Sequence, residues 1–301
     1  MPAIDDRCSL RSLAADESLA GTASTIRRWL LVVHAGPWGR NGLLDARLPD
    51  GIGRELRALE GRTGARVLLI RRPGRLPEPG DDTLRCFAID TRDAWLGSVA
   101  LDRIGDAVEL DPRDRTSFRA DPEDRLFVVC THGRRDPCCA ERGRPVARAL
   151  AGAFPDATWE STHVGGDRFA ANLVAFPHGL YFGRLDPDEA TRIAGRYAEG
   201  RIGSLARYRG RSSDPFHVQA ADRALRGHLG LDRIDDVAPA DSARRGSSAE
   251  VRFTTPNGRY AVQVERVAGP PMRLTCQAVT EEARPSWRVL GIEREHGEAA
   301  R

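Results

Sequence analysis

Thiols and an imidazole follow two short β-prone runs near the middle of the chain. Cys130 ends the first run, and Cys138 and Cys139 come soon after it in a loop rich in Gly, Arg, Asp and Pro. His163 follows the second run, Thr158–Thr162. Thiolate sulfur and imidazole nitrogen are the ligands that zinc and iron–sulfur clusters prefer. The two segments therefore hold the side chains of a candidate metal site.

The elements around these residues predict that they converge. We expect a strand at Arg125–Cys130, a helix at Arg142–Gly152 and a strand at Thr158–Thr162. Such a unit pairs its strands in parallel through a right-handed crossover, so the loops after both strands lie at one edge of the sheet. We expect the ligating atoms of Cys130, Cys139 and His163 to lie within about 8 Å of each other, the span of a two-iron centre with some slack.

A fourth ligand is less well defined by the sequence. Asp167 lies four residues after His163 and can reach the same metal, although a carboxylate is a harder ligand than imidazole. The carboxylate can instead bind Arg168 or a backbone N–H of its own turn. The alternative ligands are Cys138, His132, His178 in the turn Pro177-His178-Gly179, or water.

Three motifs in this region resemble the sucrase/ferredoxin-like family, a branch of thioredoxin-like [2Fe–2S] ferredoxins. They are Cys130-x8-Cys139 with Arg135-Asp136 inside it, Thr162-His-Val-Gly-Gly-Asp-Arg-Phe-Ala-Ala-Asn172, and Pro177-His-Gly-Leu-Tyr-Phe-Gly-Arg184. The resemblance implies a thioredoxin-like fold and a [2Fe–2S] cluster held by two Cys and two His. Cys130, Cys139 and His163 map onto three of those ligands. Asp167 stands where the family pattern has its second His.

Three functions follow from these residues. The first is an iron–sulfur electron carrier, rather than a stand-alone enzyme, that works with a redox partner protein not identified by the sequence. The second is a thiol–disulfide oxidoreductase, against which stands the lack of a Cys-x-x-Cys motif and the strain of a disulfide between adjacent cysteines. The third is a structural zinc protein. No pair of carboxylates indicates glycoside hydrolysis.

The composition is that of a soluble globular protein. The chain has 301 residues, 30% charged and 41% hydrophobic, and a formal net charge of +3, which gives no argument for nucleic acid. No run is long enough to cross a membrane, and Arg27-Arg28 precedes an apolar run that we interpret as a buried strand rather than a twin-arginine signal. Six dispersed cysteines favour a reducing cytoplasm. Cys86 and Cys276, in strand-like runs, are expected to be buried thiols rather than ligands.

The predicted fold class is α/β (α+β), with two thioredoxin-like βαβ-ββ units in tandem. We expect an N-terminal tail at 1–24, a degenerate thioredoxin-like half at 25–118, a ferredoxin domain with the Cys/His site at 119–208, and a C-terminal helix plus β-meander at 209–301. In the first half, His34 is predicted to take the place of Cys130, so this half is expected to keep the fold without the cysteine ligands.

The C-terminal segment is predicted from its turn and helix signals. We expect a polar linker at Arg207–Pro215, a helix at Pro215–Leu229 and a flexible stretch at Pro239–Ser248. Three strands should follow, near Ala249–Thr255, Tyr260–Val267 and Arg273–Val279, and Pro256-Asn-Gly-Arg between the first two indicates a hairpin. This segment would cap the sheet or form a small winged-helix-like module.

Overall fold

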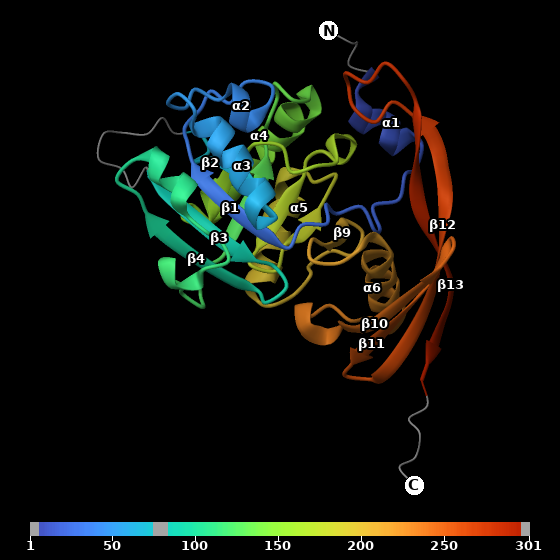
Figure 1. Ribbon diagram of the computed structural model, residues 1–301. Coiled ribbons are helices and arrows are strands. Elements are labelled where there is room, and N and C mark those ends of the chain that lie inside the picture. The colour runs from blue at the N-terminus through green and yellow to red at the C-terminus, as the bar shows by residue number, and fades with distance from the viewer. Residues whose placement is uncertain (1–5, 75–83, 296–301) are drawn as a thin grey trace.

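A mixed sheet of nine strands forms the centre of the protein (Figure 1). The computed structural model describes residues 6–74 and 84–295. The strands lie in the order β4-β3-β1-β2-β6-β5-β7-β8-β9. Their bounds are β1 (Arg28–Val33), β2 (Ala65–Arg71), β3 (Arg85–Asp90), β4 (Trp95–Ala100), β5 (Leu126–Cys130), β6 (Thr158–Ser161), β7 (Leu173–Phe176), β8 (Leu180–Phe182) and β9 (Tyr208–Arg211). The central strands are continuous apolar runs because both faces of the sheet are covered.

The sheet consists of two halves with the same strand order. In the first half, β1 pairs in parallel with β2 and antiparallel with β3, which pairs with β4. In the second half, β5 pairs in parallel with β6 and antiparallel with β7, which pairs with β8. The halves join edge to edge where β2 pairs antiparallel with β6. The predicted α/β fold class, with a βαβ unit and a hairpin in each half, is confirmed.

The packing of β1 and β5 corrects one predicted equivalence between the halves. Both strands contribute alternate residues to one shared apolar cluster: Trp29, Leu31 and Val33 from β1, and Leu126, Val128 and Cys130 from β5. This alternation aligns Val33, not His34, with Cys130. The predicted match of His34 to Cys130 is therefore wrong by one residue, and a shift of one residue in a strand turns the side chain to the opposite face.

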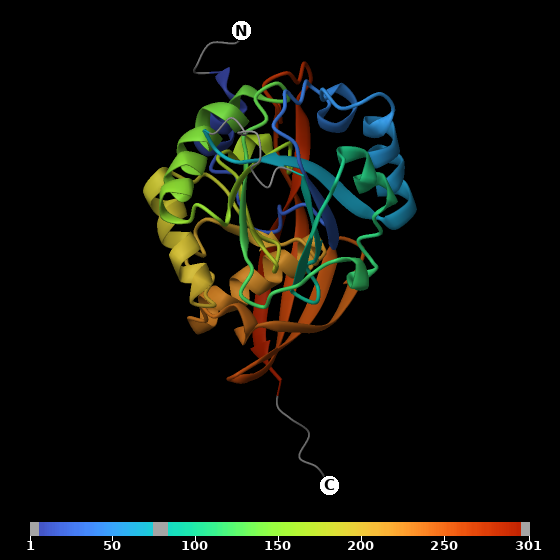
Figure 2. The ribbon, with the colours of Figure 1, turned by 90° about the vertical axis from the view of Figure 1, so that its left-hand side faces the viewer.

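Helices cover one face of each half, and the other faces share a core. The helices are α2 (Gly42–Asp45), α3 (Ile52–Thr63), α4 (Pro137–Ala153) and α5 (Pro187–Ala198). In Figure 2, α3 lies to the right of the curled sheet and α4 with α5 to its left. Short 3₁₀ turns are η2 (Ile104–Glu109), η3 (Arg115–Ser117), η4 (Asp167–Phe169) and η5 (Ile234–Asp236). Within the described residues, no helix is both long and apolar enough to cross a bilayer.

A second sheet and the two ends of the described chain lie beside this body (Figure 1). The antiparallel sheet contains β10 (Ala238–Arg245), β11 (Ser248–Thr255), β12 (Gly258–Met272) and β13 (Glu282–Arg294), in that order. Helix α6 (Phe216–Leu229) packs against its apolar face. The segment predicted as an N-terminal tail contains α1 (Cys8–Ala14), which lies next to the loop between β12 and β13.

Four predicted elements differ from the structure. The helix predicted at Arg142–Gly152 begins at Pro137, so the cysteine pair lies in its first turn rather than in a loop. The predicted linker at Arg207–Pro215 contains β9, the last strand of the large sheet. Pro239–Ser248, predicted to be flexible, is mostly strand β10. The strand predicted at Arg273–Val279 is a loop, and the next strand, β13, begins only at Glu282.

Candidate metal centre

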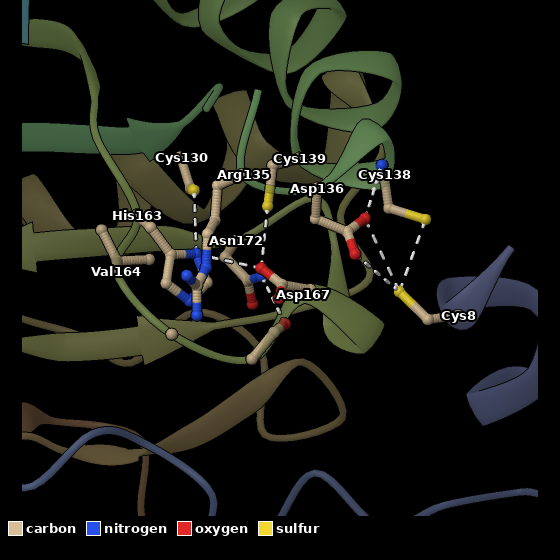
Figure 3. Close-up of polar contacts among 12 residues, drawn as sticks. Cys8, Cys130, Arg135, Asp136, Cys138, Cys139, His163, Val164, Asp167 and Asn172 are labelled. Carbon is tan, nitrogen blue, oxygen red and sulfur yellow. Dashed lines mark hydrogen bonds and ion pairs between the residues drawn. The ribbon is translucent and has the colours of Figure 1, made fainter. Parts of the chain in front are cut away.

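The two cysteines and the histidine converge where β5 and β6 end (Figure 3). Cys130 is the last residue of β5, Cys139 lies in the first turn of α4, and His163 follows β6. The parallel register pairs Cys130 with Ser161, which brings both strand ends to one edge. One donor atom from each of the three side chains lies within 4.8 Å of the other two. The predicted convergence is confirmed.

The start of α4 fixes the position of Cys139. Asp136 caps the helix, since its Oδ1 accepts the Cys138 N–H at 2.9 Å, and Pro137 follows at the first helical position. The Gly, Arg, Asp and Pro content of this stretch favoured a loop in the sequence analysis. Asp followed by Pro is, however, a helix-start signal, and the same pair, Asp186-Pro187, starts α5.

Asp167 lies against both the histidine and one cysteine. Its Oδ1 is 2.9 Å from His163 Nδ1 and accepts a hydrogen bond from Cys139 Sγ at 3.2 Å. Asp167 is only 4% exposed, and it opens the 3₁₀ turn η4 directly after Gly165 and Gly166, which both have positive φ. These two glycines let the chain turn back toward the strand end. A fourth donor therefore contacts two of the other three, His163 and Cys139.

Hydrogen bonds within the group set its charge. The bond from Cys139, and then that from His163, lowers the pKa of the buried Cys130 thiol, while the same bond raises the pKa of Cys139. Burial would lower the pKa of His163, but its bonds to Asp167 and Cys130 outweigh burial and raise it to about 9. Burial alone would raise the pKa of Asp167. The hydrogen bond from His163 outweighs burial, and this pKa is lowered. The group thus stabilises anionic sulfur and anionic oxygen beside a cationic ring.

The three alternative ligands point elsewhere. Cys138 Sγ faces away from this group and lies 3.6 Å from Cys8 Sγ and 3.4 Å from Cys276 Sγ (Figure 3). His132 Nε2 is 2.9 Å from the Gly39 carbonyl oxygen. His178 Nδ1 is 2.6 Å from the hydroxyl of Tyr197, and burial lowers the pKa of His178 to about 4. Cys86 is a buried thiol within β3, as the sequence predicted.

A second group of donors contains residues that the sequence analysis did not connect. Cys8, Asp136, Cys138 and Cys276 present one donor atom each, all within 4.8 Å of one another. Cys276 was expected in a strand-like run, but it lies in the loop between β12 and β13. Because positions 8 and 276 lie at opposite ends of the chain, no spacing motif in the sequence could have joined them.

Comparisons with known proteins found a family and a relative to which this chain is similar. The chain is 29% identical over 114 residues to a protein of the yeast Meyerozyma guilliermondii named "Altered inheritance of mitochondria protein 32". That match covers 35% of this chain and 38% of the relative, so it spans well under half of either protein. No solved structure matches. The family model for sucrase/ferredoxin-like proteins matches residues 19–210, which include both halves of the nine-stranded sheet and all four residues of the first group, and the chain belongs to this family.

Proposed function

We propose that this protein transfers electrons through a [2Fe–2S] cluster held by Cys130, Cys139, His163 and Asp167. The observation that carries the proposal is the convergence of two buried thiols, an imidazole and a buried carboxylate at the ends of two parallel strands. A [2Fe–2S] cluster takes four protein ligands, and imidazole can replace thiolate on one of its irons. When bound, the cluster would supply reversible one-electron chemistry.

The donor set fits such a group in number and in burial. Cys130 and Cys139 are 1% and 0% exposed, so bulk water is kept from the sulfur atoms. The carboxylate of Asp167 is directed at two of the other donors, which suits a ligand better than a surface acid. The side chain of His163 is 20% exposed, and it therefore offers a route for an electron between the buried centre and the surface.

The same burial argues against thiol–disulfide exchange. A thiol oxidoreductase attacks a disulfide of another protein, and this requires a nucleophilic sulfur at the surface. Neither Cys130 nor Cys139 meets that requirement. A zinc ion at the same residues is the remaining alternative, since zinc also accepts sulfur, nitrogen and oxygen ligands. Metal analysis distinguishes zinc from iron and sulfide.

The surface beside the centre favours an acidic redox partner. A cavity of about 640 Å³ opens next to Cys130 along Thr131–Arg134. Its lining includes Arg40, Arg47, Arg71, Arg134 and Arg144, against a single acidic residue, Asp45. A cationic surface attracts a partner that carries acidic groups and speeds its encounter at low salt. A reducing cytoplasm suits this function, because the thiolate ligands must stay reduced.

The test is the metal content and colour of the full chain purified without oxygen. We expect iron and acid-labile sulfide in equal amounts, two of each per chain, and a red-brown colour that dithionite bleaches. Cys130→Ser and Cys139→Ser should abolish the colour, because a weakly acidic hydroxyl is a poor substitute for thiolate on iron. Cys138→Ser is the matched control and should keep it, since its sulfur faces the other group. Colourless protein that holds zinc instead of iron at these residues would refute the proposal.

A further inference from the structure

Three sulfur atoms outside the proposed cluster form a nearly equilateral triangle. Cys8 Sγ lies 3.6 Å from both Cys138 Sγ and Cys276 Sγ, and the last two are 3.4 Å apart. None of the three cysteines forms a disulfide. A disulfide joins two sulfurs at about 2.05 Å and leaves no place for a third equivalent partner. An oxidised pair of cysteines therefore does not explain this arrangement of three sulfurs.

The spacing is that of thiolates around one tetrahedral ion. A Zn–S bond of about 2.3 Å gives sulfur–sulfur distances of about 3.8 Å in a tetrahedron. The observed separations of 3.4–3.6 Å lie within about 0.4 Å of that value. Sulfur ligands of a four-iron cluster lie farther apart, because they sit at the corners of a larger body. The triangle fits a single ion.

Asp136 completes the donor set on the fourth side. Its two carboxylate oxygens lie 3.7 and 3.6 Å from Cys8 Sγ, and the residue is 0% exposed. Oδ1 accepts the Cys138 N–H at 2.9 Å, and Oδ2 accepts the Cys276 N–H at 2.7 Å. These two backbone donors orient the carboxylate toward the sulfurs, in the manner of the outer hydrogen bonds that hold metal ligands.

Further hydrogen-bond donors lie beside two of the three sulfurs. The Ser9 hydroxyl donates to Cys138 Sγ at 3.3 Å, and the Cys8 backbone N–H donates to Cys276 Sγ at 3.4 Å. Cys138 also lies in the first turn of the 17-residue helix α4, where the helix dipole stabilises negative charge. Arg7, 6% exposed, also lies beside the group, where its guanidinium pairs with the carboxylate of Glu141.

We propose that Cys8, Cys138, Cys276 and Asp136 form a structural zinc site. The site goes beyond the electron-transfer function and does not depend on it. Its ligands come from α1, from the start of α4 and from the loop between β12 and β13. One ion would thus tie both ends of the described chain to the helix that carries Cys139. All four positions have protein ligands, as in zinc sites that serve structure rather than catalysis.

The test uses the Cys130→Ser variant as background, because the first centre cannot assemble there. We expect this protein to keep one equivalent of zinc, and the zinc-free form to bind one Co²⁺ with the intense visible bands of tetrahedral thiolate coordination. Adding Cys8→Ser or Cys276→Ala should lower bound zinc to near zero. Cys276 lies in a partly exposed loop, so its replacement leaves the core intact. Cys86→Ser, a buried cysteine outside both groups, is the control and should keep the zinc.

The outcomes separate this site from the cluster. In the otherwise native chain, Cys276→Ala should remove zinc and leave iron and colour unchanged, whereas Cys139→Ser should remove iron and leave zinc unchanged. A Cys130→Ser protein that binds neither zinc nor cobalt would overturn the proposal. So would equal zinc content in that protein with and without Cys276→Ala. A native chain that contains zinc but no iron would count against the cluster and not against this site.

Discussion

Substitution of Gly143 tests how closely α4 must approach β5. A Cβ atom at Gly143 would lie 2.2 Å from the carbonyl oxygen of Cys130 and 3.2 Å from its carbonyl carbon. Ordinary carbon–oxygen contacts begin at about 3.3 Å, so Gly143→Ala requires a separation of about 1 Å. The obstructing atoms belong to the backbone of a buried strand, and no flexible side chain can move aside.

The cost follows from this overlap. Overpacking of a core contact destabilises a protein by about 1–3 kcal/mol, and the better helix propensity of Ala returns only about 1 kcal/mol. Cys139 lies one helical turn before Gly143 on the same side of α4. An outward shift of about 1 Å therefore also carries its sulfur away from Cys130, which should shorten the lifetime of the proposed cluster.

Gly152 in the same helix provides the control. A Cβ there meets nothing within 4 Å, so Gly152→Ala should stabilise the protein by about 0.5–1 kcal/mol through helix propensity alone. Urea unfolding measures both variants, and the decay of visible absorbance in air measures cluster lifetime. We expect Gly143→Ala to lower the unfolding midpoint and shorten the lifetime, and Gly152→Ala to do neither. Two variants that are equally stable and equally coloured would refute the reasoning.

Two further predictions concern single side chains. Asp167→Ala should shorten the lifetime of the proposed cluster about 10- to 100-fold if the carboxylate is a ligand or orients one. Asp167→His should keep or lengthen that lifetime, because imidazole is the softer donor. An unchanged spectrum and lifetime in Asp167→Ala would exclude Asp167 as the fourth ligand. The pKa of His178 is about 4 in the folded chain, below its ordinary value of 6.5, so the unfolded chain takes up the proton first and stability falls as the pH drops from 6.5 to 4. The loss can reach about 3 kcal/mol. His178→Phe should flatten the change in unfolding free energy between pH 7 and pH 4.5, and an equal slope in both proteins would contradict the assignment.

The sequence predicted the elements whose local signals agree with their surroundings. The β5–α4–β6 unit and the convergence of Cys130 with His163 followed from apolar runs and from the parallel pairing that a crossover imposes. Helix α6, predicted at Pro215–Leu229, lies at Phe216–Leu229. In each case the local preference and the tertiary role lead to the same structure.

The predictions of secondary structure failed where tertiary contacts override the local composition. β9 looked like a polar linker because Arg209 lies in it, yet this side chain is 1% exposed and donates to Asn172 Oδ1 at 2.7 Å. β10 was predicted to be flexible because its sequence has no alternation of polar and apolar residues. In the structure every residue of this strand is exposed, which explains the missing alternation. The Cys8–Cys276 contact spans almost the whole chain, and only the fold can reveal it.

The seam between β2 and β6 has the symmetry of a contact between two identical subunits. Ile70 pairs with Val33, Ser161 pairs with Cys130, and Val33 and Cys130 are equivalent positions. Ile70 and Ser161 are therefore equivalent to each other, and across the seam they are partners. A two-fold axis through this pair relates the halves, as in an isologous dimer. Fusion of the two genes of such a homodimer would yield this arrangement directly. In this arrangement one half completes the sheet and has Val33 at the position where the other half has Cys130.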